Sequence, residues 1–195
     1  MESEKTQSLH PSLSCDILGR FIGKRIARLV RYSWWKKEDV ASECGIENEQ
    51  AFSLTAGPLA IVFEDGSTLG VASEPSINSV IVWLDRVGGQ AKMAPALDED
   101  TELFPIDSID EIYADQFWRQ FTKITLVGFS ILKRKSMSTG ERELPSELGL
   151  CFHFDGNKKF IAAHGLHDGS DDFAVLNDGQ IELTTCEQLE ELALL

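Results

Sequence analysis

The feature that most constrains the fold of this chain is a hairpin pattern that occurs once in each half. Apolar residues alternate along Leu59–Phe63 before an Asp65-Gly66 turn, and Leu150–Phe154 repeats the alternation before Asp155-Gly156, with a slip of one residue. Residues two apart share one face of a strand, and Asp-Gly is a strong hairpin signal because glycine accepts a positive φ. The alternation predicts that six side chains face a core, namely Leu59, Ile61, Phe63, Leu150, Phe152 and Phe154.

The elements expected around each hairpin follow one order: a short helix, a long strand, the hairpin and a third strand. The flanking elements are Leu13–Ile22, Lys24–Ser33 and Val80–Leu84 in the first half, and Asp107–Gln120, Thr122–Lys133 and Phe173–Leu176 in the second. We therefore predict an α+β fold, mostly antiparallel β with a helix per half, built as a tandem pseudo-repeat. Residues 1–97 and 98–195 would be the halves, or one compact domain built from both. The alternative is that two such segments match by chance.

Two expectations concern the connection between the halves. The acid-rich stretch Ala96–Pro105 is expected to be a linker. Asp107 or Ser108 is expected to cap the helix that follows, because short polar side chains accept hydrogen bonds from the free backbone N–H groups of a first turn. Ile109 and Ile112 would then lie on the apolar face of that helix.

Two more expectations concern the end of the chain. Ile181–Leu183 is expected to add one short strand. Thr184 and Glu187 have the spacing of a capping box, which predicts a final helix that runs to Leu194.

No local pattern in the sequence encodes a catalytic centre or a cofactor site. Four cysteines lie far apart, and the Gly-x-Ser-x-Gly, P-loop and dinucleotide-binding motifs are missing. His153, His164, His167 and Asp168 are close in sequence but lack the acid-bearing helix of a zinc enzyme, and Cys151 beside His153 lacks a third, orienting group. We therefore expect no catalytic residue, no metal and no cofactor. The alternative is a small-molecule-binding or enzymatic domain with a pocket between the two halves.

The distribution of charge indicates the kind of partner. The formal net charge is −14, and no Lys or Arg occurs from Ala94 to Trp118 or after Lys159. Such a field repels nucleic acid and anionic membranes and attracts a basic protein. The cations and aromatic residues of Arg20–Lys37 would suit nucleic-acid binding, but we expect them to pair with the acidic stretches. The predicted partner is therefore a basic protein, with no nucleic acid and no membrane.

The predicted location is the cytoplasm. Met1–His10 has no apolar core of a signal peptide. No stretch of the sequence approaches the ~20 consecutive apolar residues that a membrane-spanning helix needs.

A small, acidic α+β chain with Asp-Gly hairpins after Phe63 and Phe154 resembles the immunity proteins of bacterial polymorphic-toxin systems. The resemblance spans both hairpins and includes no diagnostic motif, so it assigns no functional residue. It implies a non-enzymatic protein that binds and neutralises a cognate toxin, often a nuclease, in the producing cell. An acidic adaptor for another basic protein is a further binding role that stays open.

The candidate partner-binding residues follow from this hypothesis. A nuclease needs a basic cleft to hold phosphates, and an acidic inhibitor can occupy that cleft. Charges at the rim of an interface mainly raise the association rate, whereas a few buried aromatic residues carry most of the affinity. The candidates are Asp98, Glu99, Asp100, Glu102, Asp168, Asp171, Asp172, Trp34 and Trp35.

Overall fold

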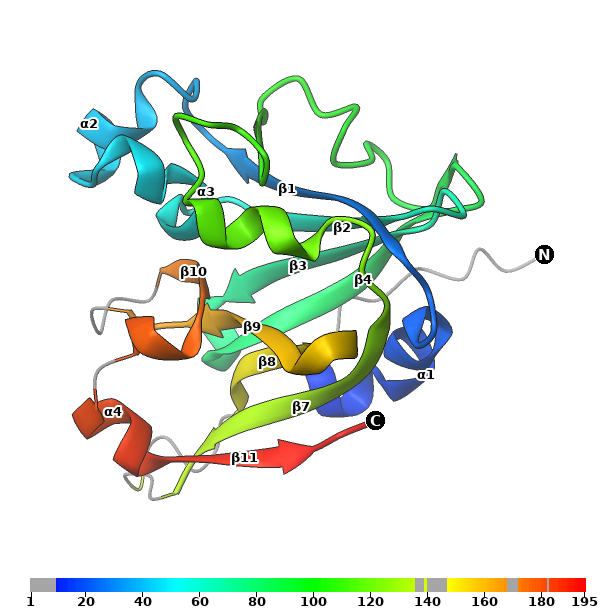
Figure 1. Ribbon diagram of the computed structural model, residues 1–195, viewed down its shortest axis with the longest axis vertical. Coiled ribbons are helices and arrows are strands. Elements are labelled where there is room, and N and C mark those ends of the chain that lie inside the picture. Colours follow the sequence, from blue (N-terminus) through cyan, green and yellow to red (C-terminus); the bar gives the residue numbers. More distant parts are fainter. Residues whose placement is uncertain (1–9, 136–138, 140–146, 168–171, 182) are drawn as a thin grey trace.

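A computed structural model of the chain describes residues 10–135, 139, 147–167, 172–181 and 183–195. These residues form two antiparallel sheets and a few short helices, a mixed α/β fold of mostly antiparallel strands (Figure 1). The first sheet contains β1 Ile26–Ser33, β2 Leu59–Phe63, β3 Thr68–Glu74, β4 Ser79–Val87, β5 Gln90–Ala91 and β6 Phe104–Asp107. The second contains β7 Leu126–Arg134, β8 Glu147–Phe154, β9 Lys158–His164, β10 Phe173–Leu176 and β11 Leu189–Ala193. The α-helices are α1 Cys15–Leu18, α2 Val40–Cys44, α3 Ala51–Leu54 and α4 Leu183–Gln188.

The strand order is closely similar in the two sheets. It is β5-β4-β3-β2-β1-β6 in the first sheet and β10-β9-β8-β7-β11 in the second. In each sheet, four consecutive strands form an antiparallel meander, and a later strand returns to pair with the first strand of the meander. The connections within each meander join neighbouring strands, whereas β6 and β11 are reached by segments that cross back over the sheet to its first strand.

The hairpin residues form the shared interior of the two sheets, as the alternation predicted. Leu59, Ile61, Phe63, Leu150, Phe152 and Phe154 are all buried in one hydrophobic cluster, which confirms the expected faces. Phe152 lies opposite Phe160 across β8 and β9, and their rings stack with centroids 4.8 Å apart. The same cluster holds side chains from both halves of the chain, so neither sheet has this core to itself.

The segments that precede β1 and β7 cross and bond to each other. The N–H of Gly23 donates to the carbonyl of Leu126, and the N–H of Lys123 donates to the carbonyl of Ile26, both at 2.8 Å. Gly23 and Lys123 each have a positive φ, which turns the chain into the strand that follows. This reciprocal crossing ties the two sheets together through backbone hydrogen bonds.

Arg31 ties the sheets together at a second place, on the inner face of β1. It is fully buried, and its guanidinium donates to the carbonyls of Phe52, Thr55, Gly57 and Phe173. It also lies over the ring of Phe173, 4.5 Å from the centroid. Burial lowers the pKa of Arg31 to about 9, which leaves the group cationic at neutral pH. One cation thus joins β1, the α3 region and β10.

The helix expected over Asp107–Gln120 is wrong. Asp107 ends β6, the following residues form turns, and only Gln116–Phe121 is helical, as a 3₁₀ helix. The Asp107 and Asp110 carboxylates accept hydrogen bonds from backbone N–H groups two residues further on. Such side-chain bonds compete with helix formation. Ile109 and Ile112 are consequently 56% and 58% exposed rather than packed on a helix face.

Two further expectations are wrong at their ends. They are the linker at Ala96–Pro105 and the final helix to Leu194. Phe104–Asp107 is strand β6, which pairs with β1, and Leu189–Ala193 is strand β11, which pairs with β7. The helix that was predicted from the capping-box spacing is only the short α4. Leu183 begins this helix, so the strand expected at Ile181–Leu183 is absent from the described part of that stretch. An open strand edge offers unpaired backbone groups, and a nearby segment gains hydrogen bonds by joining it.

Candidate binding groove on the outer face of the first sheet

The outer face of each sheet is covered by the segment that leads to its returning strand. Residues 92–103 cover the first sheet, where Leu103 joins a small apolar cluster with Val30. Residues 177–181 and 183–188 lie at the outer face of the second sheet, where Ile181 belongs to a larger cluster. Both covered faces leave a hollow, of about 290 Å³ on the first sheet and about 220 Å³ on the second, and the two faces differ in chemistry.

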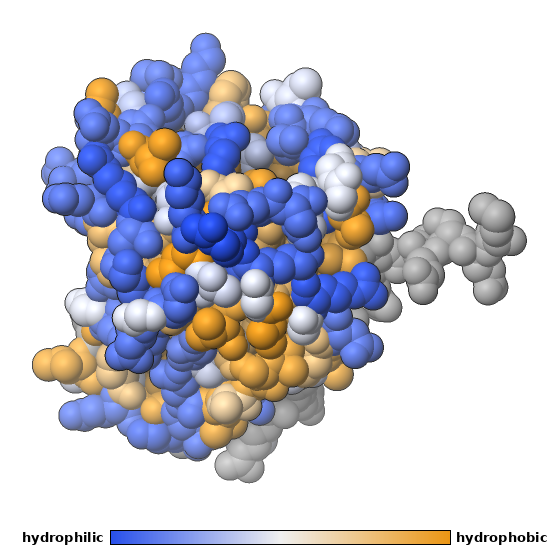
Figure 2. Space-filling model, turned by 45° about the vertical axis from the view of Figure 1, so that its right-hand side comes forward, coloured by the Kyte–Doolittle hydropathy of each residue, from blue (hydrophilic) through white to orange (hydrophobic). Residues whose placement is uncertain are grey.

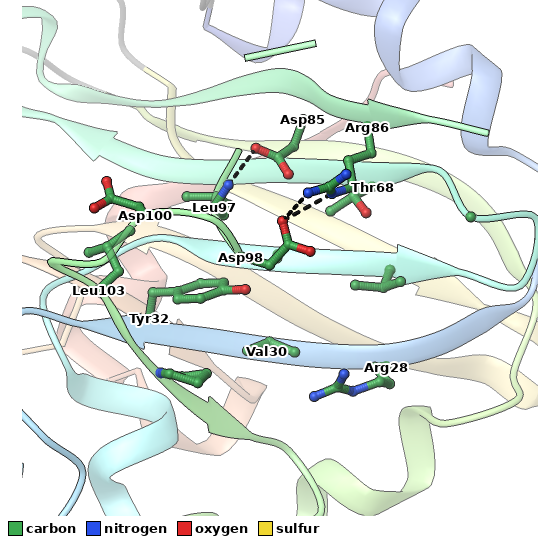
Figure 3. Close-up of a pocket in the computed structure, with 14 residues that line it drawn as sticks. Arg28, Val30, Tyr32, Thr68, Asp85, Arg86, Leu97, Asp98, Asp100 and Leu103 are labelled. Atoms are coloured by element: carbon green, nitrogen blue, oxygen red, sulfur yellow. Dashed lines mark hydrogen bonds and ion pairs between the residues drawn. The ribbon is translucent and has the colours of Figure 1, made fainter. Parts of the chain in front are cut away.

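A groove of about 290 Å³ lies between the outer face of the first sheet and residues 92–103 (Figure 3). Its apolar lining includes Val30, Ala60 and Val62 of the strands and Leu103 of the covering segment. Because successive strand residues point to opposite faces, these outward side chains are separate from the shared core. The groove therefore has an apolar floor within an otherwise charged region.

Arg86 fixes the acidic side of this groove. Its guanidinium contacts the carboxylates of Asp98 and Glu99, each at 2.5 Å, and donates to the carbonyl of Gly89 at 2.9 Å. These two acids raise the pKa of Arg86 above its ordinary value. The second cation in the lining, Arg28, pairs with Asp107 at 2.9 Å. Both cations are thus engaged by acids of the chain itself.

Asp85 lies in the wall of the groove and is almost fully buried. Its Oδ1 accepts a hydrogen bond from the backbone N–H of Leu97 at 3.1 Å, which anchors the covering segment to β4 (Figure 3). Burial raises the pKa of Asp85.

The neighbouring Trp83 packs over Gly70, where a Cβ would come within 2.1 Å of the indole, so only glycine fits there.

Tyr32 lies on the outer face of β1 and is 6% exposed. Its ring lines the groove, and its hydroxyl points toward the side where Asp98 lies (Figure 3). Burial, together with the negative charges of Asp98 and Asp85, raises the pKa of Tyr32 to about 12. Within the described ranges, no hydrogen bond reaches this hydroxyl.

The structure brings together only part of the predicted partner-binding set. Asp98, Glu99, Asp100 and Glu102 all lie in the segment that covers the groove. Trp34 follows β1 and is 53% exposed. Of the remaining candidates, Trp35 and Asp172 line a second hollow. Asp168 and Asp171 lie outside the described residues.

The second hollow has a volume of about 500 Å³ and is lined by residues of both halves. Trp35, Cys44 and His167 are among them. The Nδ1 atom of His167 is buried and has no hydrogen-bond partner among the residues that the structure describes.

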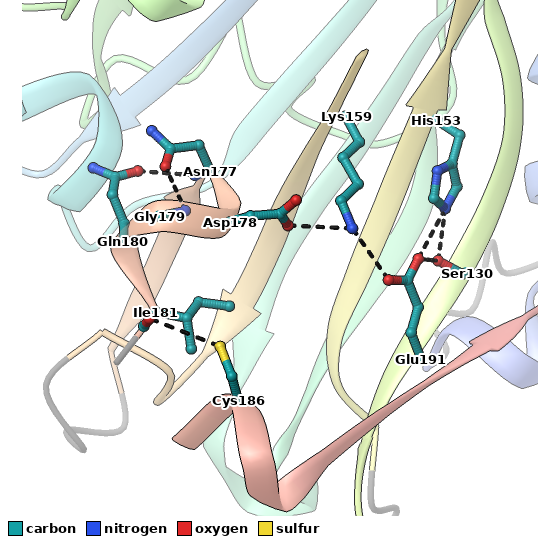
Figure 4. Close-up of polar contacts among 10 residues, drawn as sticks. All are labelled: Ser130, His153, Lys159, Asn177, Asp178, Gly179, Gln180, Ile181, Cys186 and Glu191. Atoms are coloured by element: carbon teal, nitrogen blue, oxygen red, sulfur yellow. Dashed lines mark hydrogen bonds and ion pairs between the residues drawn. The ribbon is translucent and has the colours of Figure 1, made fainter. Parts of the chain in front are cut away.

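A polar cluster occupies the outer face of the second sheet (Figure 4). The hydroxyl of Ser130 lies 2.7 Å from Nε2 of His153 and 2.5 Å from the carboxylate of Glu191. Lys159 pairs with Glu191 and with Asp178, both at 3.2 Å. A Ser-His-acid triad needs the acid on the other imidazole nitrogen, whereas here Ser130 and Glu191 both meet Nε2 of His153. The cluster therefore has the geometry of a structural network.

Cys151 and His164 also have structural surroundings. Burial raises the pKa of the Cys151 thiol to about 12, which disfavours the reactive thiolate. His164 is buried, and its ring nitrogens lie 2.5 Å from Ser73 and 3.0 Å from Asn78, so it connects β9 to the first sheet. In the part of the chain that the structure describes, no three His, Cys, Asp or Glu side chains form a group that could hold a metal ion.

Sequence reasoning missed Tyr32, Asp85 and Arg86 as groove residues. They come from β1 and β4, and they converge only because β2 and β3 pair between them. The sequence held one signal for two of them. The charged pair Asp85-Arg86 directly follows the apolar run Val80–Leu84 and ends it.

The remaining surface also carries exposed apolar residues. Figure 2 shows a mainly hydrophilic upper part and apolar side chains gathered in the lower part of the same face. The exposed large apolar residues include Leu13, Ile109, Ile112, Val127 and Leu183.

Comparison of the chain with family models, curated proteins and solved structures found no match. None of the described helices is long and apolar enough to cross a membrane.

Proposed function

We propose that this chain is a non-enzymatic binding protein that captures a basic protein on the outer face of its first sheet. The observation that carries the proposal is the position of Asp98, Glu99, Asp100 and Glu102, which lie together in the segment over the groove. Arg86 holds two of these acids in place, so their charges are presented from an anchored segment. Fixed negative charge beside an apolar groove is complementary to a basic protein surface.

We propose that the biological role of this capture is that of an immunity protein, which neutralises a cognate bacterial toxin. Support comes from the net charge of −14, from the resemblance to such proteins in size and hairpin pattern, and from the clustering of acids at one groove. A nuclease toxin presents a basic cleft to its substrate, and an acidic surface can block that cleft.

The test begins with the protein encoded by the gene next to that of this chain. Growth is measured when that neighbour is expressed alone and together with this chain, and binding of the purified pair is measured by surface plasmon resonance. A toxic neighbour that this chain binds and neutralises supports the immunity role. If no neighbour is toxic and none binds, the immunity role is contradicted.

The binding face is tested with two charge-matched variants. One carries Asp98→Asn, Glu99→Gln, Asp100→Asn and Glu102→Gln. The other removes four exposed acids elsewhere, at Glu38, Glu49, Glu187 and Glu190. We expect the first variant to associate about tenfold more slowly at low salt, and to show less salt dependence, because charges near the contact steer association. Equal association rates for the two variants would contradict this binding face.

A second candidate function is favoured by the hollow of about 500 Å³ that residues of both halves line. The buried Nδ1 of His167, without a partner in the described ranges, suits a small polar ligand. Thermal-shift screening of metabolites against the protein and its His167→Ala variant tests this candidate. A ligand that raises the melting temperature of the parent but not of the variant would support it.

We further propose that the two sheets arose by tandem duplication. The shared strand order and the reciprocal bonds of Gly23 and Lys123 support this origin. Superposing β1–β4 and β6 on β7–β10 and β11 in an experimental structure tests it. All five strands should match in order, and inward residues should fall on inward residues; a mismatch of inner and outer faces would contradict the duplication.

A further inference from the structure

The groove on the outer face of the first sheet has more hydrogen-bond acceptors to spare than donors. Arg86 is engaged by Asp98, Glu99 and Gly89, and Arg28 is engaged by Asp107. On the acidic side, Oδ1 of Asp98 meets Arg86, whereas Oδ2 meets no donor of the described chain. The groove is therefore short of donors, which a cationic ligand would supply.

Asp100 adds a second carboxylate to the lining of the groove. Its Oδ1 accepts a hydrogen bond from the backbone N–H of Glu102 at 2.9 Å, which orients the side chain within its loop. Asp100 lines the groove, and no cation of the described residues pairs with it. Its carboxylate lies at the other end of the groove and points away from Asp98, so a ligand cation beside the Tyr32 hydroxyl would meet the carboxylate of Asp98 (Figure 3).

An independent observation comes from Tyr32. The residue is 6% exposed, yet its hydroxyl has no hydrogen-bond partner among the described residues and points along the groove toward Asp98 (Figure 3). The hydroxyl oxygen is open to the groove, so a ligand atom that enters the groove can bond to it directly. Because the raised pKa keeps this hydroxyl protonated at neutral pH, it can both accept from a ligand and donate to a carboxylate.

The size and the floor of the groove limit what can enter. Its volume of about 290 Å³ lies at the lower end for small-molecule pockets, which suits one long side chain. Val30, Ala60 and Val62 offer an apolar surface along which the aliphatic part of such a side chain can lie.

We propose that the groove receives an arginine side chain of a protein partner, whose guanidinium contacts Asp98 and the Tyr32 hydroxyl. This inference rests on the proposed capture of a basic protein and names the chemical group that the groove recognises. Arginine fits better than lysine because a guanidinium is planar and weakly hydrated, presents five donors in a fixed array and stacks on aromatic rings. Lysine presents a compact, strongly hydrated charge that would not stack on the Tyr32 ring.

The test uses N-acetyl-arginine amide as the probe and the full ¹⁵N-labelled chain as the receptor. N-acetyl-citrulline amide is the neutral control of the same shape, and N-acetyl-lysine amide carries the same charge in another form. We expect saturable amide shifts in residues 97–103 with the arginine probe, binding at least about threefold weaker with the lysine probe, and no saturation with citrulline. Equal binding of arginine and citrulline probes, or shifts confined to other parts of the chain, would overturn the proposal.

Variants assign the binding to the groove. Tyr32→Phe keeps the ring and removes the hydroxyl, and we expect about fivefold weaker binding of the arginine probe, since a single hydrogen bond is lost. Asp98→Asn should also weaken binding, and it is the second groove variant if the Tyr32 variant does not fold. Glu191→Gln removes a charge from the outer face of the second sheet and should leave binding unchanged. Unchanged affinity in both groove variants would rule out this site.

The outcome is separable from that of the proposed function, because the probe titration needs no partner protein. If the probe does not bind while partner association still depends on Asp98–Glu102, the arginine inference fails and the capture of a basic protein stands. If the probe binds at the groove while no basic partner is captured there, the proposed function fails and the guanidinium site stands.

Discussion

The outer faces of the two sheets show how one strand arrangement can be used in two ways. On the first sheet, outward positions of the strands include Arg28, Thr68 and Arg86, and a groove of about 290 Å³ stays open. On the second sheet, the corresponding face presents Ile161 and Leu176, which belong to a second hydrophobic cluster. Both faces are covered by a segment that leads to a returning strand, and the second also keeps a hollow, of about 220 Å³. The outward strand residues therefore decide whether the covered face is mainly charged or mainly apolar.

The largest expected effect concerns what the sheets share, the buried Arg31 between them. Arg31→Met should lower the free energy of unfolding by more than about 3 kcal/mol, because it leaves four buried carbonyls without their donor. The control is Arg28→Met on the outer face of the same strand, where the side chain is 60% exposed. That change should cost less than about 1 kcal/mol. Urea unfolding of both variants measures the difference; similar losses would show that Arg31 is not a tie between the sheets.

The second prediction compares the apolar content of the two outer faces. Leu176→Ala removes a fully buried side chain from the second sheet and should cost about 2–4 kcal/mol. Leu103→Ala, at the rim of the groove, should cost less because its site already adjoins open space. Chemical denaturation of the two variants tests the ranking. A larger loss for Leu103→Ala would mean that the covering segment of the first sheet contributes the more important core.

The third prediction compares two hydroxyl groups. Ser130→Ala removes a hydroxyl that bridges His153 and Glu191, and it should cost about 1 kcal/mol. Tyr32→Phe removes a hydroxyl that has no partner in the described chain, so stability should change by less than about 0.5 kcal/mol. Thermal unfolding monitored by circular dichroism is sufficient. If Tyr32→Phe were the more damaging, the Tyr32 hydroxyl would have an important bond within the folded chain.

The smallest expected effect is a difference in pH dependence between the two faces. Burial raises the pKa of Asp85 above 3.8, so the folded chain holds this proton more tightly than the unfolded chain. Its contribution to stability is greatest below pH 3.8 and falls as the pH rises through the folded pKa. Burial acts in the same direction on Glu191, but hydrogen bonds from Ser130 and Lys159 outweigh it and lower the pKa below 4.5. The contribution of Glu191 is therefore present above pH 4.5 and is lost as the pH falls through the folded pKa.

Asp85→Asn and Glu191→Gln should consequently change the pH profile in opposite directions. Relative to the parent, Asp85→Asn gains stability as the pH rises from about 4, whereas Glu191→Gln loses stability over the same rise. Urea midpoints between pH 3 and 7 provide the measurement, and each change in slope should correspond to less than one proton. Slopes that change in the same direction would show that the two carboxyl groups have similar surroundings.

Much of the sheet structure could be predicted because its signals are local. The alternation at Leu59–Phe63 and Leu150–Phe154 reports directly which side chains face the interior, and the structure has them there. The strand expected at Lys24–Ser33 is β1 at Ile26–Ser33, a difference of two residues at one end. The returning strands β6 and β11 could not be predicted in this way, since they form only where a free edge of β1 or β7 is available.

The candidate site also combines features that the sequence determines with features that only the tertiary structure decides. The sequence by itself determined that Asp98, Glu99, Asp100 and Glu102 lie together, because they are neighbours in the chain, and that the protein carries a strong negative charge. Only the tertiary structure decided that these acids lie over an apolar groove and that Arg86 holds two of them in place. It also decided that the Tyr32 hydroxyl faces the groove without a partner in the described chain. The physical reason is that charge and alternation are properties of neighbouring residues, whereas the meeting of β1, β4 and residues 92–103 depends on strand pairing across long separations in sequence.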